Sequence, residues 1–136
     1  MATPTFFNSF KEALSEKVHN LGSDQLKIAL TNSAPSTSNT VLANITEITY
    51  TNLSTRNVTT ISSAQTSGTY KLDLTDLVLT STGGSTGPFR YIVLYNDTAA
   101  SDELIYFLDY GSSITLADTE TFTLDFDATN GLWQLA

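Results

Sequence analysis

Alternation of apolar and polar residues is the dominant pattern along this chain, and it predicts a mainly β protein. Residues 121–127 show it most clearly, because Phe and Leu alternate there with Thr and Asp, as in a strand with one buried face. Residues 89–95 and 104–110 are apolar at nearly every position, which indicates strands buried on both faces. Shorter strands are expected at 26–31, 58–61, 70–74, 77–79, 114–116 and 132–135. About seven to eight strands with short turns predict an antiparallel β-sandwich or a flattened barrel.

The first part of the chain has a helical pattern instead. Apolar residues recur there at spacings of three and four, which predicts one amphipathic α-helix over residues 5–21. Ser9 followed by Glu12 fits a capping box, and Gly22 fits a glycine stop. An earlier start, with Pro4 at the first helical position, is an alternative.

The segments between the strands are predicted to be irregular. Residues 32–56 begin as a polar loop and continue as an ambiguous stretch, so we expect a long excursion with little regular structure. Residues 62–68 and 81–88 are rich in Ser, Thr and Gly and predict turns. The alternation shifts by one position near Thr75, which predicts a bulge or corner. Residues 127–131 contain Asn-Gly and predict a turn from which the last strand pairs back.

Length and composition narrow the class of protein. A chain of 136 residues suits one domain, with the helix 5–21 followed by a β domain over 24–135. The absence of cysteine excludes disulfides, thiolate catalysis and zinc–thiolate sites. A net charge of −8 argues against binding to nucleic acid. We find neither a membrane-spanning apolar run nor a signal-peptide layout, and we expect a soluble intracellular product.

The charge is distributed unevenly along the chain. Residues 1–71 carry five basic and four acidic side chains, whereas residues 72–136 carry Arg90 and ten acidic side chains. One interpretation is a solvated acidic β surface. The other is an acidic outer face opposed to a neutral or basic face that docks on a partner.

Candidate catalytic and metal-binding residues do not form a recognisable set. The single histidine, His19, is expected in the last turn of the helix, where it would interact with terminal carbonyls rather than act in a catalytic triad. Asp125 and Asp127 project to the same face of a strand, but on its solvent side. The glycine-rich loop 83–87 lacks the Lys-Ser/Thr ending of a phosphate-binding loop. We therefore expect no enzyme, no cofactor and no metal.

Two further features leave alternatives open. A sugar-stacking surface, as in a carbohydrate-binding module, could be lined by Tyr50, Tyr91, Tyr95, Tyr106, Tyr110 and Trp133, although most of them lie on strand faces expected to form the core. Arg90, alone among acidic residues, is a candidate for a bidentate ion pair either within the fold or between subunits.

Four segments together resemble small virion proteins of tailed bacteriophages that are associated with the head genes. They are residues 19–32 (HNLGSDQLKIALTN), 65–72 (QTSGTYKL), 83–97 (GGSTGPFRYIVLYND) and 109–126 (DYGSSITLADTETFTLDF). The likeness spans nearly the whole chain and departs from the family pattern at residues 51–57, where a glycine-rich stretch is usual. The resemblance implies a capsid decoration (cement) protein on the capsid surface. Its expected partners are the major capsid protein and copies of itself, with which it would form a homotrimer. Another virion component, such as a tail, neck, fibre or spike protein, is the alternative.

If the chain coats a capsid, contacts to the shell or to a neighbouring copy are expected from the N-terminal aromatic segment, the excursion over 32–56 and the isolated arginine. The individual candidates are Phe6, Phe7, Phe10, Ile45, Tyr50, Arg56 and Arg90.

Overall fold

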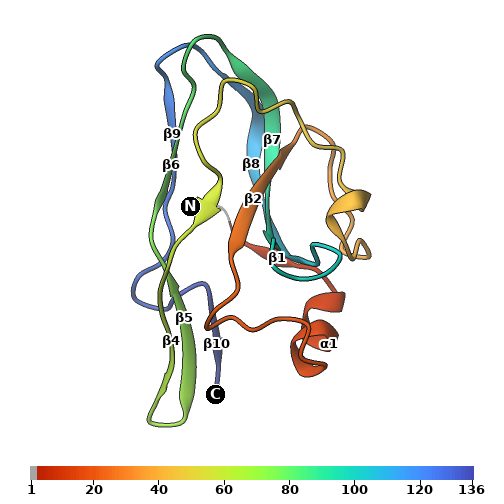
Figure 1. Ribbon diagram of the computed structural model, residues 1–136, viewed down its shortest axis with the longest axis vertical. Helices are drawn as coiled ribbons and strands as arrows, with labels where there is room; N and C mark the ends of the chain where they lie inside the picture. Colours follow the sequence, from red (N-terminus) through yellow and green to blue (C-terminus); the bar gives the residue numbers. More distant parts are fainter. Residues whose placement is uncertain (1–2) are drawn as a thin grey trace.

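The fold consists of two layers of antiparallel strands with one short helix at the edge (Figure 1). The computed structural model describes residues 3–136. The larger layer is a five-stranded sheet in the order β1-β8-β7-β2-β3. Its strands are β1 (Thr5–Phe6), β8 (Leu104–Leu116), β7 (Thr86–Asn96), β2 (Leu26–Thr31) and β3 (Asn57–Val58). The predicted mainly β, sandwich-like architecture is confirmed, and β7, which is apolar on both faces, is the central strand.

The second layer contains a three-stranded and a two-stranded sheet, in the orders β10-β5-β4 and β6-β9. Its strands are β4 (Thr60–Thr66), β5 (Thr69–Leu74), β6 (Leu77–Thr80), β9 (Thr121–Leu124) and β10 (Trp133–Leu135). The chain turns a corner between β5 and β6 at Thr75 and Asp76, where the shift of alternation predicts one. The hairpin of β4 and β5 extends beyond the larger sheet at the lower end of Figure 1.

Apolar side chains fill both sides of the five-stranded sheet. Ile28 pairs with Leu94, and both belong to the main core between the two layers. Ala29 pairs with Val93 one position further along, so these residues face the opposite side. There they are fully buried in a second cluster, which Leu42 of the excursion also joins. This second cluster explains why the central strands are apolar at nearly every position.

The helix is much shorter than predicted. α1 covers only Ser9–Ser15, because the chain before it is extended and Phe6 pairs with Tyr106 in β8. The helix cannot continue to residue 21, since Lys17 has a φ of 67°. Of the residues in the apolar spacing, Phe7, Phe10 and Leu21 are buried, but they lie in segments of different conformation, and Val18 is exposed. His19 therefore lies in a loop and not in the last helical turn.

Three strand predictions are also wrong in detail. β4 runs through residues 62–66, where we expected a turn, because this polar strand lies at the edge of its sheet and needs little apolar alternation. β8 continues past Gly111, which has a φ of 97° within the strand. The last strand, β10, pairs with β5 and not with β9, since the turn at Gly131 brings Leu132 to the carbonyl of Leu72.

The excursion over residues 32–56 contains little regular structure, as predicted. Its one helical element is a 3₁₀ turn, η1, at Leu42–Asn44. The amide side chain of Asn44 accepts hydrogen bonds from the backbone N–H groups of Thr40 and Val41 and thereby fixes this turn.

Candidate functional site

Tyr50 and Arg56 hold the excursion against the edge of β2. The Tyr50 hydroxyl accepts a hydrogen bond from the N–H of Leu30 at 2.9 Å and donates one to Glu47 at 2.7 Å. The Arg56 guanidinium lies 3.7 Å from the centre of the Tyr50 ring and donates to the carbonyl of Ile28 at 2.7 Å. Burial raises the pKa of Tyr50 well above its usual value, so the hydroxyl stays protonated. These two candidate contact residues have a clear structural role within the chain.

The N-terminal aromatic residues lie inside the fold to different degrees. Phe7 and Phe10 are each 1% exposed, and they belong to the second cluster and the main core respectively. The prediction that these two residues contact a partner does not fit this burial. Phe6 and Ile45 are half-buried, so part of each side chain stays accessible.

Arg90 forms its ion pair within the fold. Its Nε and Nη2 donate to the two carboxylate oxygens of Asp109 at 2.7 and 2.9 Å, across neighbouring strands. The Arg90 guanidinium, together with the N–H of Gly111, holds the pKa of Asp109 below its usual value. This geometry answers the question left open by the sequence, because Arg90 already has a carboxylate partner in its own chain.

The two aspartates near the end of β9 are exposed, as the alternation predicts. Asp127 accepts hydrogen bonds from the N–H groups of Thr129 and Asn130 and from the Asn130 side chain, so its oxygens stabilise a turn. These bonds lower the pKa of Asp127. Within residues 3–136 there is no group of three or more His, Asp or Glu side chains placed to hold a metal ion.

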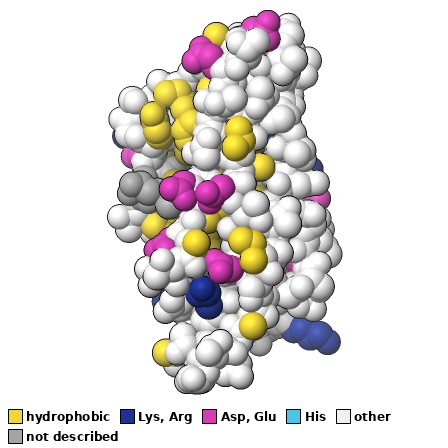
Figure 2. All heavy atoms as spheres, turned by 90° about the vertical axis from the view of Figure 1, so that its left-hand side faces the viewer, with side chains coloured by type: hydrophobic (Ala, Val, Ile, Leu, Met, Phe, Trp, Pro, Cys, Tyr) yellow, Lys and Arg dark blue, Asp and Glu magenta, His cyan; other side chains and the backbone are white. Residues whose placement is uncertain are grey.

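The outer face of the second layer, which we call the acidic face, carries carboxylates with patches of apolar side chains among them (Figure 2). Acidic side chains lie across this face from its top to its lower half, and basic ones lie mainly at its lower end. The strands of this layer lie in residues 60–80 and 117–136, and Lys71 is the one basic residue within these two stretches. The acidic residues of these two stretches are Asp73, Asp76, Asp118, Glu120, Asp125 and Asp127.

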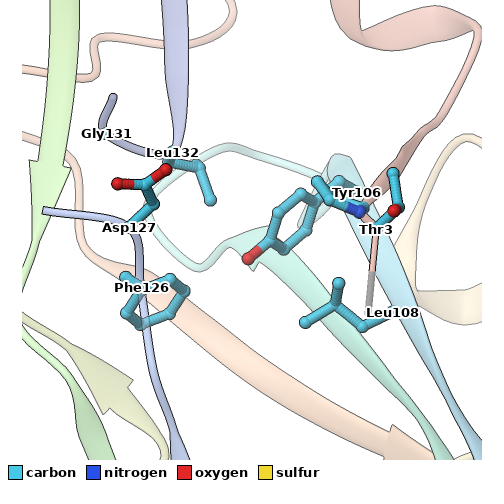
Figure 3. A pocket seen from close by; sticks show the side chains of 8 residues that line it. Thr3, Tyr106, Leu108, Phe126, Asp127, Gly131 and Leu132 are labelled. Carbon is cyan, nitrogen blue, oxygen red and sulfur yellow. The ribbon is translucent and has the colours of Figure 1, made fainter. Parts of the chain in front are cut away.

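A pocket of about 270 Å³ lies where β8 approaches the segment that leads into β10 (Figure 3). Its walls are mainly apolar, and the Tyr106 hydroxyl points into it between Leu108 and Phe126. Burial raises the pKa of Tyr106 well above its usual range, so the phenol is neutral at physiological pH. Asp127 lies at the opposite wall, but its oxygens are engaged in the turn. This pocket offers one neutral hydroxyl and no assembled acid–base pair.

A larger groove of about 680 Å³ lies between the loop after α1 and the inner face of the β4-β5-β10 sheet. We call it the helix–hairpin groove. His19 and Trp133 both line it, and each packs against Phe10, with ring centres 5.5 and 5.3 Å apart. The sequence places His19 at a helix end and Trp133 in the last strand, but no spacing rule brings two such distant residues together.

His19 is held by a network of buried hydrogen bonds. Its Nδ1 lies 3.0 Å from the side-chain amide nitrogen of Asn96, which also donates to Asp24 at 2.7 Å. The Asn96 oxygen accepts from the N–H groups of Thr98 and Ala99, which fixes the orientation of this amide. Since the amide nitrogen can only donate, Nδ1 accepts and the neutral ring carries its proton on Nε2.

We expect protonation of His19 to destabilise the fold. Burial lowers the pKa of His19 from 6.5, although Glu103 and Asp24 oppose the shift. The unfolded chain therefore binds more protons than the folded chain below the ordinary histidine pKa, and the free energy of unfolding decreases as the pH falls through that range. His19→Asn, whose Oδ1 is as many bonds from the backbone as Nδ1 and can still accept from Asn96, should lose less stability between about pH 7.5 and about pH 5. Urea unfolding at several pH values measures both slopes, and equal slopes would contradict the prediction.

Comparisons with known proteins give no relative. No protein-family model matches the chain, and neither a curated protein nor a solved structure matches it. The helices in the described part of the chain are all too short to cross a membrane. The function has to be argued from the residues and their arrangement.

Proposed function

We propose that this chain is a structural component of a bacteriophage particle, a capsid decoration (cement) protein that binds the outer surface of the head. It bridges neighbouring copies of the major capsid protein and associates with itself as a homotrimer. The sequence resemblance to small phage virion proteins suggests this role. The structural observation that carries it is the difference in charge between the excursion over residues 32–56 and the outer face of the second layer.

The excursion over residues 32–56 is electrically neutral by itself. Its only charged side chains are Glu47 and Arg56, which lie 3.8 Å apart and neutralise each other. The rest of the segment is rich in Ser, Thr and Asn, and it packs on the five-stranded sheet through Leu42 and Ile45. A neutral surface held on a rigid sheet can dock on another protein with little cost from desolvated charge.

The acidic outer face of the second layer is suited to solvent. Its carboxylates would repel one another and would lose hydration if they were covered by a partner. In the proposed orientation this face points away from the shell, and the excursion faces the shell. Many copies, each making modest contacts across subunit boundaries, would then stabilise the head through multivalency.

The chemistry of the described residues supports a role that depends on surfaces. The His19 imidazole bonds to the Asn96 amide, and Asp127 is engaged in a turn. Arg90 and Asp109 form a closed pair. Each of these polar groups therefore stabilises the fold in the observed arrangement.

Charges introduced on the excursion should weaken particle binding. Ala43 and Thr46 are exposed on the excursion, and Thr121 and Thr123 are exposed on β9 in the acidic face. We expect the double variant Ala43→Asp, Thr46→Asp to bind particles that lack the protein at least about tenfold more weakly, since two buried charges oppose docking. The matched variant Thr121→Asp, Thr123→Asp should bind as the unchanged protein does.

Cosedimentation with purified particles measures binding, and quantitative gel analysis gives the copy number. Hundreds of copies per head, together with greater heat resistance of the shell, are expected. A few copies labelled at a single vertex would instead identify a tail, neck, fibre or spike component. Absence of binding, or an equal loss of binding in both double variants, would contradict the proposed docking face.

A further inference from the structure

The Tyr106 hydroxyl is an unbonded polar group that a ligand can reach. The side chain is 3% exposed, and burial alone raises its pKa, with no contribution from a hydrogen bond within residues 3–136. In the same part of the chain, the unbonded polar atoms that are closed off from solvent belong to His19, Asp73 and Trp133. The Tyr106 hydroxyl is not among them, and it points into the pocket between β8 and the segment that leads into β10 (Figure 3). Since buried tyrosine hydroxyls usually have a partner, this one marks a place for a ligand atom.

The walls around this hydroxyl are apolar. Leu108 and Phe126 are buried on its two sides, and Pro4 and Leu132 complete the apolar lining. The volume of about 270 Å³ lies just below the range of roughly 300–1,000 Å³ that is usual for drug-sized ligands, so the pocket suits a smaller molecule. A charge among these side chains would lose its hydration, and the ligand group that meets Tyr106 therefore has to be neutral.

Asp127, at the opposite wall, selects the charge at the other end of the ligand. Hydrogen bonds from the N–H and side chain of Asn130 and from the N–H of Thr129 lower the pKa of Asp127, so it is ionised at neutral pH. These three bonds leave one of the roughly four acceptor directions of the carboxylate open. Because Asp127 is exposed, a cation beside it keeps part of its hydration, whereas an anion is repelled.

The two polar groups and the apolar walls define one class of ligand. We propose that this pocket binds a small aromatic molecule with an aliphatic ammonium group at one end, beside Asp127, and a neutral oxygen at the other end, bonded to the Tyr106 hydroxyl. The ring lies between Leu108 and Phe126, where it packs against another ring and loses little conformational freedom. This inference goes beyond the proposed virion role and depends only on the pocket.

Tyramine is the probe for this test, because it has a phenol oxygen and an ammonium group at opposite ends of one ring. We would titrate the isotope-labelled full-length protein and follow the backbone N–H resonances of Gly131 and Leu132, which line the pocket. Saturable shifts are expected. Phenethylamine, which lacks the oxygen, should bind at least about fivefold more weakly. The anion para-hydroxyphenylacetate, which keeps the ring and the oxygen, should bind at least about tenfold more weakly.

Tyr106→Phe removes the hydroxyl and keeps the ring. It should weaken tyramine binding about fivefold or more and leave phenethylamine binding unchanged, since phenethylamine has no oxygen to bond. Its urea midpoint should equal that of the unchanged protein, because the lost hydroxyl had no partner. Tyr110→Phe is the matched control, since Tyr110 is 51% exposed and lies outside the pocket, and it should bind both amines as the unchanged protein does.

Asp127→Asn removes the charge and keeps an oxygen for the turn. It should weaken binding of both amines about threefold, a modest effect because solvent screens the exposed carboxylate. Asp118→Asn makes the same change in net charge outside the pocket, where an exposed carboxylate accepts from the N–H of Gly83, and it should leave binding unchanged.

The inference is overturned if tyramine shifts neither resonance saturably, if either comparison ligand binds as tightly as tyramine, or if Tyr106→Phe weakens both amines equally. A lowered urea midpoint of Tyr106→Phe, or equal effects of Asp118→Asn and Asp127→Asn, would also overturn it. None of these results depends on phage particles, so failure here is distinct from failure of the proposed decoration role.

Discussion

Phe10→Ala is expected to lower the free energy of unfolding by about 3–5 kcal/mol. Phe10 is 1% exposed and lies where α1, β1 and β10 meet. Its ring contacts Phe6, Trp133 and His19 at centre distances of 5.4, 5.3 and 5.5 Å. Removal of the ring therefore leaves a cavity bounded by three other rings, of which Trp133 belongs to the other end of the chain.

Urea unfolding of the isolated protein measures this loss. Tyr110→Ala provides the control, since Tyr110 is 51% exposed and makes one edge contact with Phe122. This change should cost about 1 kcal/mol or less. Similar losses in the two variants would show that Phe10 does not connect the helix to the sandwich. A large loss in Phe10→Ala would show that the residue stabilises the single chain, whatever partner the chain has.

The strands could be predicted where the pattern of apolar and polar residues follows which faces of the strand are buried. The apolar run at 89–95 identifies the central strand β7, because both of its faces are covered. The phase shift near Thr75 identifies the corner between β5 and β6. In each case the signal is local, since a residue's own neighbours in sequence show which face is buried.

The predicted helix over 5–21 shows where this reasoning stops. Phe7, Phe10 and Leu21 are all buried, as the helical spacing suggests, but only Phe10 belongs to α1. Burial alone does not distinguish a long helix from a short helix flanked by an extended strand and a loop. The difference depends on the pairing of Phe6 with β8, a long-range contact that has no local signature.

The groove could not be predicted for the same reason. His19 and Trp133 come together because β10 pairs with β5 and does not fold back on β9. The sequence signal that favoured the other pairing was the Asn-Gly turn ending at Gly131. In the structure this turn leads the chain to the carbonyl of Leu72.

The other large effect is expected from Asn96→Asp. Asn96 is fully buried, and its amide nitrogen donates to the carboxylate of Asp24 at 2.7 Å and to Nδ1 of His19 at 3.0 Å. Aspartate would keep the acceptor oxygen for Thr98 and Ala99 but would place a second carboxylate against Asp24. At neutral pH we expect a loss of about 3–5 kcal/mol, because a buried charge is placed beside a half-buried one and a donor disappears.

The same substitution should give the loss a defined pH dependence. Two carboxyl groups that share a buried site hold a proton between them, so the folded variant has one raised pKa. The folded variant then binds more protons than its unfolded chain above the ordinary carboxyl pKa, and the penalty relative to the unchanged protein grows as the pH rises from about 4 to about 7. Asn130→Asp is the matched control, since the Asn130 amide donates to Asp127 at 2.8 Å in an exposed turn. Solvent screens that pair, so the control should lose about 1 kcal/mol or less. If Asn96→Asp loses no more than Asn130→Asp at pH 7, the buried network does not position His19.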